Sequence, residues 1–463
     1  MQKDKQKIMI LNDNLWQVMF KLSWPAVVAM VLHGLNSVFD AVFVGRFVGE
    51  TAFAGLSLAY PLSMLFLGLG SLIGVGAGSA LSIALGANDY DTQRKLLGNV
   101  NYMNLTYGFF VTVLGLILAT VLIKMMGGRG DELKFGVDYF RVTLYGSVFW
   151  IAGLSGNMIV RAEGKMGCAA VMMALGVVVN IIANYILIVI FDFGVKGAAW
   201  GTNLAMLVYT LVFFIYAGKK KTSFNARPFS IRRDKSIIKS ILSMGMPSLI
   251  MSVMGLIQGV VVLNALSRFG TTGDVAFYGI VFRIHLLMLT PIIGLMRALQ
   301  PAIGINFGAE KYDRVINSFN IFAVAATVIM VPFWLAMMIS PQFVLNMVLP
   351  AKEFLSSDLA NFRIFILLLP ILPLIFMAMT FFPAINNANP ASIIGIARQL
   401  VFYIPVMLTL PRFFGVKWVY IGSFLIDLVI TIWTFALVTA EFKKLRQGNV
   451  KQPLTGVPSG KEA

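Results

Sequence analysis

Long apolar stretches recur along the whole chain, and they constrain its fold more than any other feature. Of the 463 residues, 58% are hydrophobic and 12% are charged, whereas a soluble domain carries about 25% charged residues. An α-helix needs about 20 apolar residues to cross a bilayer, and only helices and closed barrels satisfy their backbone groups within lipid. We therefore predict an all-α polytopic membrane protein.

Hydropathy predicts twelve transmembrane helices. The first apolar stretch is too long for a signal peptide and is interpreted as a span. The expected spans are residues 16–45, 53–85, 96–124, 136–160, 166–191, 197–217, 237–266, 275–306, 314–340, 358–384, 391–411 and 418–441.

The two halves of the chain resemble each other weakly. An offset of 222 residues places Pro25 on Pro247 and Gly86-Ala87 on Gly308-Ala309. Because each half holds six expected spans, both halves enter the membrane the same way up. This pattern indicates a parallel internal repeat related by an axis along the membrane normal.

The repeat divides the chain into two lobes and two polar segments. We expect an N-terminal lobe with helices 1 to 6 over residues 1–217 and a C-terminal lobe with helices 7 to 12 over residues 237–446. A basic cytoplasmic linker, residues 218–236, joins the lobes. A tail rich in Gly, Pro and Lys, residues 447–463, is expected to be disordered.

The net charge of +17 is a topology signal rather than a sign of nucleic-acid binding. Most Lys and Arg fall in segments on one side of the membrane, with the largest run between Lys219 and Lys239. Because positive charge is enriched in cytoplasmic loops, both termini are predicted to be cytoplasmic. The same charge attracts an anionic inner leaflet, so membrane lipids are expected partners and nucleic acid is not.

The second span is rich in small residues at three- and four-residue spacing, which allow another helix to approach closely. A bendable helix that lines a cavity is the alternative interpretation. The residues are Gly68, Gly70, Ser71, Gly74, Gly76, Gly78 and Ser79.

Catalytic motifs are missing from the sequence. There is no nucleophile elbow, phosphate-binding loop or zinc-protease pattern, and there are only two histidines. Neither enzyme activity nor a metal site is therefore expected. The single cysteine, Cys168, excludes an internal disulfide and is expected to be a small buried hydrophobe.

Asp40 is the strongest functional candidate, because the duplicated scaffold does not repeat it. The offset of 222 places Asp40 on Val262, and an ionisable residue within a span is costly and marks a functional site by default. Polar residues of the same half could surround it as a site for proton or cation coupling. They are Asn36 one turn earlier, Asn157 in the fourth span, Asn180 and Asn184 one turn apart in the fifth, and Thr202 in the sixth.

Two chemistries are open to such a site. Desolvation disfavours the charged form of a carboxylate, so Asp40 could take up a proton on one side of the membrane and release it on the other. Carboxylate, amide and hydroxyl oxygens are also ligands for a hard cation such as Na⁺.

The second half is expected to be mostly apolar at the matching positions, although Gln258 matches Asn36. Arg283 could form a structural ion pair with Asp427, act as a gate, or serve as a counter-ion for substrate. Flexible thioethers suit a cavity that accepts many shapes. Gln258, Arg283 and Met377 are therefore candidates for the substrate cavity.

Several motifs, in this order and at these spacings, resemble the bacterial form of the multidrug and toxic compound extrusion (MATE) family across nearly the whole chain. In the first half they are Val38-Phe39-Asp40-Ala41-Val42-Phe43-Val44-Gly45, Gly86-Ala87, Leu97-Gly98-Asn99, Ile159-Val160-Arg161-Ala162-Glu163-Gly164-Lys165 and Gly197-Ala198-Ala199-Trp200-Gly201-Thr202. In the second half they include Pro291, Gln300-Pro301, Asn306, Gly308-Ala309, Tyr312 and Arg314.

The resemblance implies twelve helices in two six-helix lobes around a V-shaped cavity. It also implies export of amphipathic, often cationic compounds driven by inward flow of protons or Na⁺. Asp40 matches the acid of the first helix that couples transport in similar proteins. At position 184 the family often has Asp, and Asn184 here favours a proton on Asp40 alone.

We therefore expect a multidrug efflux antiporter of the bacterial inner membrane, acting as a monomer on small amphipathic or cationic molecules. A proton gradient, or a Na⁺ gradient, would take the place of a cofactor. The alternative is a flippase for lipid-linked oligosaccharide precursors, because Arg283 and Arg297 could contact a pyrophosphate.

Overall fold

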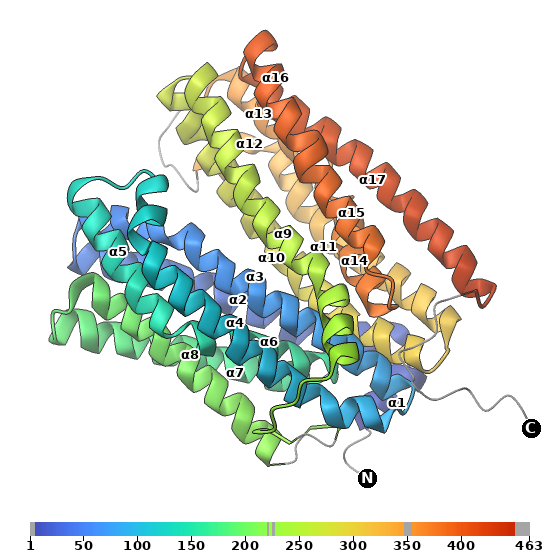
Figure 1. Cartoon of the computed structure of the whole chain (residues 1–463). Coiled ribbons are helices and arrows are strands. Elements are labelled where there is room, and N and C mark those ends of the chain that lie inside the picture. Colours follow the sequence, from blue (N-terminus) through green and yellow to red (C-terminus); the bar gives the residue numbers. More distant parts are fainter. Residues whose placement is uncertain (1–4, 220–221, 225–226, 347–353, 450–463) are drawn as a thin grey trace, which may run out of the picture.

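The computed structural model describes residues 5–219, 222–224, 227–346 and 354–449, and all regular secondary structure in these residues is helical (Figure 1). The predicted all-α class is confirmed. Most of the tail that was expected to be disordered, residues 450–463, lies outside the described residues.

The helices follow the predicted spans. The first half contains α1 (Lys5–Asn12), α2 (Leu15–Phe47), α3 (Glu50–Gly86), α4 (Tyr90–Met125), α5 (Gly130–Tyr145), α6 (Ser147–Ala162), α7 (Met166–Asn184), the π-helix η1 (Tyr185–Ile190) and α8 (Gly194–Gly218). The second half contains α9 (Lys235–Phe269), α10 (Thr272–Gly308), α11 (Tyr312–Ile339), α12 (Pro341–Asn346), α13 (Ser356–Ile366), α14 (Pro373–Ala384), α15 (Asn389–Ile396), the π-helix η2 (Ala397–Tyr403), α16 (Ile404–Phe414) and α17 (Lys417–Arg446).

Two of the twelve expected spans are interrupted. In the described part of the chain, ten helices are long and apolar enough to cross a membrane, or eleven if α5 and α6, which meet at 58°, count as one span. The expected span 358–384 consists of α13 and α14, separated by turns over residues 367–372. Pro370 and Pro373 lie at this break, where the missing N–H of proline prevents a continuous helix.

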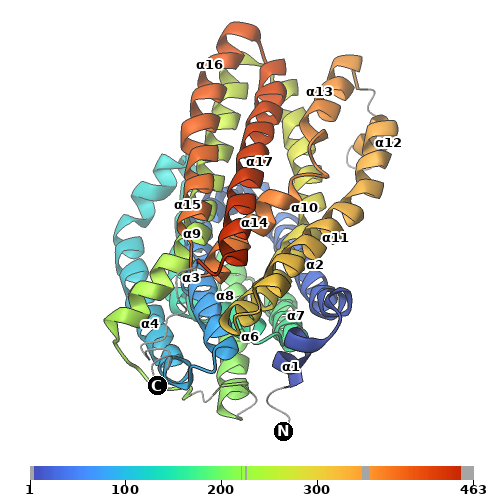
Figure 2. The ribbon, with the colours of Figure 1, turned by 90° about the vertical axis from the view of Figure 1, so that its right-hand side faces the viewer.

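The helices form two bundles, as Figures 1 and 2 show. Helices α2–α8 make up one bundle and α9–α17 the other, so that the two halves of the sequence form two lobes. The bundles meet near the end that carries α1, and they diverge toward the opposite end, where α5 and α16 lie. This arrangement matches the expected pair of lobes.

The repeat axis passes between α3 and α10. A Cβ atom added at Gly86 would overlap the carbonyl oxygen of Ile305, and one added at Gly308 would overlap that of Ile83. Gly86 and Gly308 are 222 positions apart, and so are Ile83 and Ile305. Each half therefore makes the same contact with the other, as two-fold symmetry requires.

The two halves also share unusual backbone angles at matching positions. Asn88 and Glu310, again 222 positions apart, have φ angles of 56° and 57° just after the ends of α3 and α10. Gly194 and Gly415 also have positive φ, at 54° and 85°. These residues occupy the left-handed region in which most side chains are disfavoured.

The small residues of the second span serve helix packing. Cβ atoms at Gly76 of α3 and Gly245 of α9 would overlap the backbone carbonyls of Ile241 and Leu72, respectively. Close approach of two helix backbones is the role that small residues play in membranes, where burial of apolar surface gives no driving force. The lobes are thus joined through α3.

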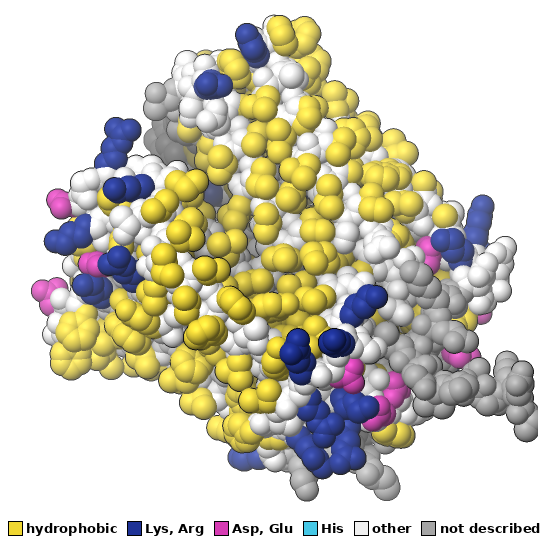
Figure 3. All heavy atoms as spheres, in the orientation of Figure 1, with side chains coloured by type: hydrophobic (Ala, Val, Ile, Leu, Met, Phe, Trp, Pro, Cys, Tyr) yellow, Lys and Arg dark blue, Asp and Glu magenta, His cyan; other side chains and the backbone are white. Residues whose placement is uncertain are grey.

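The flank of the molecule is apolar, as expected for a surface in contact with lipid (Figure 3). Large hydrophobic side chains such as Ile117 and Phe109 are 71% and 64% exposed. The expectation that Cys168 is buried is wrong, because its side chain is exposed on α7. A thiol is apolar enough to be tolerated at a surface that faces lipid.

We predict that Gly245→Ala destabilises the protein, because the new methyl group has no space against Leu72. Overpacking of this kind costs about 1–3 kcal/mol and should lower the thermal unfolding temperature in detergent. The matched control is Gly255→Ala in the same helix, where an added Cβ meets nothing within 4 Å. Equal unfolding temperatures for the two variants would contradict the close contact between α3 and α9.

Candidate functional site

Asp40 lies on α2 and accepts hydrogen bonds from neutral amides. Its Oδ1 accepts from Nδ2 of Asn184 at 2.6 Å, and its Oδ2 accepts from Nδ2 of Asn36 at 3.5 Å. Asn36 is one turn earlier on the same helix, whereas Asn184 is the last residue of α7. The short bond therefore connects two helices of the first lobe.

A chain of hydrogen bonds continues from Asn184 into α8. Nδ2 of Asn184 also lies 3.2 Å from Oδ1 of Asn180, and Asn180 donates to Oγ1 of Thr202 at 3.3 Å. The added Cβ of any residue at Gly201 would overlap Oδ1 of Asn184. The structure thus brings together five of the predicted coupling residues, Asn36, Asp40, Asn180, Asn184 and Thr202.

The charge of Asp40 has no cationic partner. Among the described residues, Asp40 takes part in no ion pair. The same residues contain no group of three or more His, Cys, Asp and Glu side chains that could hold a metal ion. A carboxylate that is half-buried among neutral amides can exist in either protonation state, because neither state is fixed by a permanent charge nearby.

Two buried amide oxygens beside Asp40 lack a hydrogen-bond partner. They are Oδ1 of Asn36 and Oδ1 of Asn184. A buried polar atom without a protein partner calls for an explanation, such as an ordered water or a change of hydrogen bonding during function. A protonated Asp40 would be an O–H donor, and either oxygen could accept from it. Oδ1 of Asn184 faces Gly201 in this structure, so it would accept from Asp40 only after the amide turns.

Two residues differ from the sequence-based picture of this site. Asn157, a predicted coupling residue, donates to the backbone oxygen of Ala169 at 2.9 Å and links α6 to α7, apart from the chain of hydrogen bonds at Asp40. Tyr139 of α5 was not predicted, yet it is buried beside Thr202 within electrostatic reach of Asp40. No pattern in the sequence distinguishes Tyr139, since aromatic residues in spans are usually part of the core.

The second lobe contains an ion pair at Asp427, but with a different partner from the one considered in the sequence analysis. Nε and Nη2 of Arg398 lie 2.9 and 2.8 Å from Oδ1 of Asp427. Arg283, the expected partner of Asp427, is exposed instead. That expectation is wrong because Arg398 lies in the π-helix η2, which directs its side chain into the lobe.

The predicted residues of the substrate cavity do not meet in one place. Gln258 accepts a hydrogen bond from Gln399 at 2.7 Å inside the second lobe. Met377 has no exposed surface and belongs to the core of that lobe, so its assignment to a cavity wall is corrected. Its neighbour Met379, on the opposite face of α14, lines a small cavity between the lobes.

This small cavity lies where α3, α9, α10 and α14 meet, and it has a volume of about 20 Å³. That is room for about one water molecule. Met251, Met296, Arg297 and Gln300 are among the residues that line it. The lobes are therefore closed against each other at this level.

We predict that Asp427→Leu destabilises the protein, because it leaves the buried charge of Arg398 without a partner. Breaking such a pair costs up to about 3–5 kcal/mol, measured as a lower unfolding temperature in detergent. The double variant Arg398→Met/Asp427→Leu should recover most of this loss. A double variant as unstable as the single one would contradict a structural role for the pair.

Known proteins share both the sequence pattern and the fold. A family model described as MatE matches residues 25–186 and 244–409, one segment in each half. The Multidrug export protein MepA of Staphylococcus saprophyticus is 29% identical over 73% of this chain and 74% of its own length. The protein of the same name from Staphylococcus haemolyticus is 26% identical over 89% and 91%.

A solved structure described as MATE in the bent conformation superimposes with a TM-score of 0.90 at 24% identity, over 96% of this chain and 99% of that one. The two structures therefore share the whole two-lobe fold. Since the family model matches both halves of the repeat, the chain belongs to the MatE family of multidrug and toxic compound extrusion transporters.

Proposed function

We propose that this protein is a secondary antiporter that exports small amphipathic, often cationic compounds in exchange for protons. Export of several drugs is the activity named for the Staphylococcus relatives. We place the protein in a bacterial plasma membrane with both termini in the cytoplasm, because the basic segments gather on one side. Neither a cofactor nor an enzymatic step enters this proposal.

One observation carries the proposal, namely that among the side chains that the structure describes, Asp40 is hydrogen-bonded only to neutral ones. An ionised Asp40 accepts from Asn184 and Asn36, as it does in this structure. A protonated Asp40 has an O–H group that needs an acceptor, and the Nδ2 groups of both amides are donors. Protonation therefore forces at least one amide to turn.

The turn of Asn184 would be transmitted to the helices. Asn184 lies between α2, α8 and the π-helix η1, and its side chain fills the space left by Gly201. A π-helical turn at a functional site is a common place for such adjustment. Breaking the bond between Asn184 and Asp40 would remove one link between α2 and α7 and allow the two helices to shift against each other.

Because the lobes diverge at one end of the molecule, the change of shape in the first lobe would release substrate to one particular side of the membrane. With cytoplasmic termini, the end at which the bundles diverge faces outward, and the small cavity lies on the closed, inner side. A proton would then reach Asp40 from outside, and the rearranged lobe would release its substrate outward. Deprotonation toward the cytoplasm would reset the site.

A flippase for lipid-linked oligosaccharides is the second candidate, and one observation favours it. Arg297 lines the small cavity between the lobes, and its buried Nε has no hydrogen-bond partner. A guanidinium with a free N–H group could bind a pyrophosphate. Tight binding of a polyprenyl pyrophosphate that is lost in Arg297→Gln would support the flippase, whereas competition among unrelated cationic dyes would support drug export.

We predict that Asp40→Asn abolishes proton-driven efflux, because the amide has nearly the same shape but no titratable proton. The measurement is extrusion of a fluorescent cation such as ethidium from proteoliposomes with an imposed pH gradient. The matched control is Asp131→Asn, the same change at an exposed acid in the first turn of α5, which should keep wild-type activity. Efflux by a correctly folded Asp40→Asn variant would contradict the proposal.

We predict that efflux by the Asn184→Asp variant depends on Na⁺. Two carboxylates within hydrogen-bond distance cannot both be ionised without a cation between them, and a pair of carboxylates is a good ligand set for Na⁺. Efflux by the wild type should be unchanged when Na⁺ replaces K⁺ at constant pH gradient, whereas efflux by the variant should rise severalfold. A wild type that already requires Na⁺ would count against proton coupling.

A further inference from the structure

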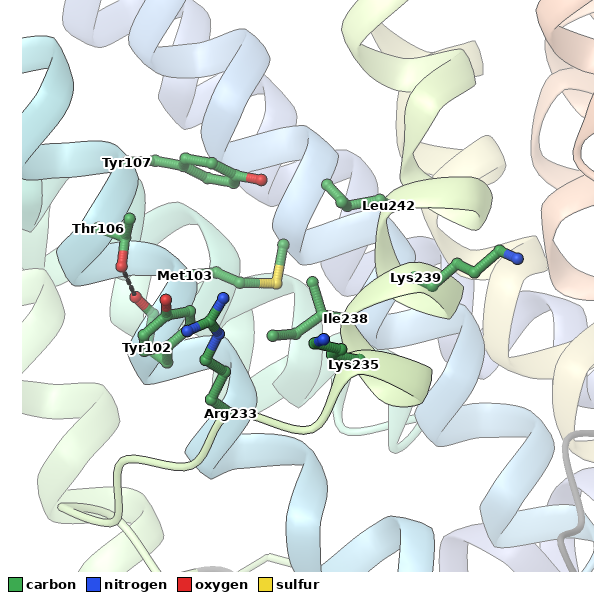
Figure 4. A pocket seen from close by; sticks show the side chains of 9 residues that line it. All are labelled: Tyr102, Met103, Thr106, Tyr107, Arg233, Lys235, Ile238, Lys239 and Leu242. Atoms are coloured by element: carbon green, nitrogen blue, oxygen red, sulfur yellow. Dashed lines mark hydrogen bonds between the residues drawn. The ribbon is translucent and has the colours of Figure 1, made fainter.

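A pocket with a volume of about 360 Å³ lies between α4 of the first lobe and the start of α9 in the second (Figure 4). It is separate from Asp40 and from the small cavity, and none of its residues takes part in the proposed coupling. It opens on the side of the molecule where the linker runs into α9. Its lining residues are Tyr102, Met103, Thr106, Tyr107, Arg233, Lys235, Ile238, Lys239 and Leu242.

The pocket is strongly basic. Arg233, Lys235 and Lys239 are exposed, and none of them forms an ion pair among the described residues. None of the nine lining residues is acidic. The nearest acid in sequence, Asp234, is already used, because its side chain caps α9 by accepting from the backbone of Ser236 and Ile237.

Polarity changes with depth along both walls. Arg233 lies with its guanidinium 5.8 Å from the centre of the Tyr102 ring, and Lys235 is beside it. Further along the helices, in the direction of the membrane, the walls are formed mainly by Met103, Ile238, Tyr107 and Leu242. Thr106 also lies at this depth, and the side chain of Lys239 points away from the other lining residues (Figure 4). From Lys235 to Leu242 the axial distance is about 10 Å. A cationic mouth thus leads to an apolar interior.

The cationic mouth is held in place by the first lobe. Oδ1 of Asn99 accepts from the backbone N–H of Asp234 at 2.7 Å, and Nδ2 of Asn101 donates to the backbone oxygens of Pro228 and Ser230. The backbone N–H of Arg232 donates to the oxygen of Gly98 at 3.0 Å. Polar side chains of α4 therefore fix the segment that carries Arg233, so the pocket is preformed.

We propose that this pocket binds an anionic phospholipid, with the phosphate at Arg233 and Lys235 and the first part of an acyl chain along Ile238 and Leu242. A soluble anion would leave the apolar walls unused. Basic pockets between transmembrane helices, with tyrosines at the level of the head groups, are the expected chemistry for an anionic lipid of the inner leaflet.

A lipid in this position would contact both lobes. Its phosphate would lie against the linker and the start of α9, and its chain would lie between Ile238 and Leu242 of α9 and Met103 of α4. It would therefore stabilise the arrangement in which the basic ends of the two lobes are close together. Anionic lipid should for this reason raise the thermal stability of the described conformation.

The test compares lipid binding by the full-length protein and by Arg233→Gln/Lys235→Gln. Native mass spectrometry would measure retention of phosphatidylglycerol and phosphatidylcholine, and thermal unfolding in mixed micelles would measure stabilisation. The charge-matched control is Lys443→Gln/Arg446→Gln, at exposed positions in the last turn of α17. A third arm replaces the lipid with sodium phosphate at equal concentration.

The wild type and the control should retain phosphatidylglycerol in preference to phosphatidylcholine, and the pocket variant should bind phosphatidylglycerol about 30-fold more weakly. Sodium phosphate should stabilise none of them. The proposal is overturned if both double variants lose binding equally, if phosphatidylcholine binds as well, or if phosphate alone reproduces the effect. If the double variant does not fold, Lys235→Gln alone should still weaken binding, and unchanged binding there would also overturn it.

Discussion

The contact of backbones through glycine is the constraint on which the rest of this structure depends. At α3 the two lobes approach so closely that a single methyl group at Gly76, Gly86 or Gly308 would collide with a carbonyl of the other lobe. Helix α2 joins the site at Asp40 to the second lobe, because it packs on α7 in its own lobe and on α10 in the other.

The two lobes use the same scaffold for different purposes. In the first lobe Asp40 is bonded to amides that can reorganise, and in the second lobe Asp427 is fixed by Arg398. An acid in an ion pair, such as Asp427, stays ionised, because its cationic partner favours the charged form. An acid among neutral groups, such as Asp40, can gain or lose a proton at a smaller cost in free energy. In the mechanism proposed above, the first lobe responds to a proton at Asp40 and the second lobe serves as a stable support.

The sequence was sufficient for the fold and for the centre of the site, because both depend on local periodicity. Hydropathy located the spans, and four-residue spacing placed Asn36 with Asp40 and Asn180 with Asn184 on shared faces. The sequence was insufficient where tertiary packing or a change of helical register determines which way a side chain points. Arg398 reaches Asp427 from a π-helix, and Met377 and Met379, two positions apart, point to opposite faces of α14. Neither result leaves a trace in hydropathy.

The most direct test of the central claim is the release of protons when substrate binds. A dye that reports pH, added to the detergent-solubilised protein in weak buffer, would show how many protons leave per molecule of cationic substrate bound. If Asp40 alternates between its neutral and ionised forms, the wild type should release up to about one proton near the pH of its titration, and Asp40→Asn should release none. Equal release by the two proteins, or none by the wild type at any pH, would contradict the account.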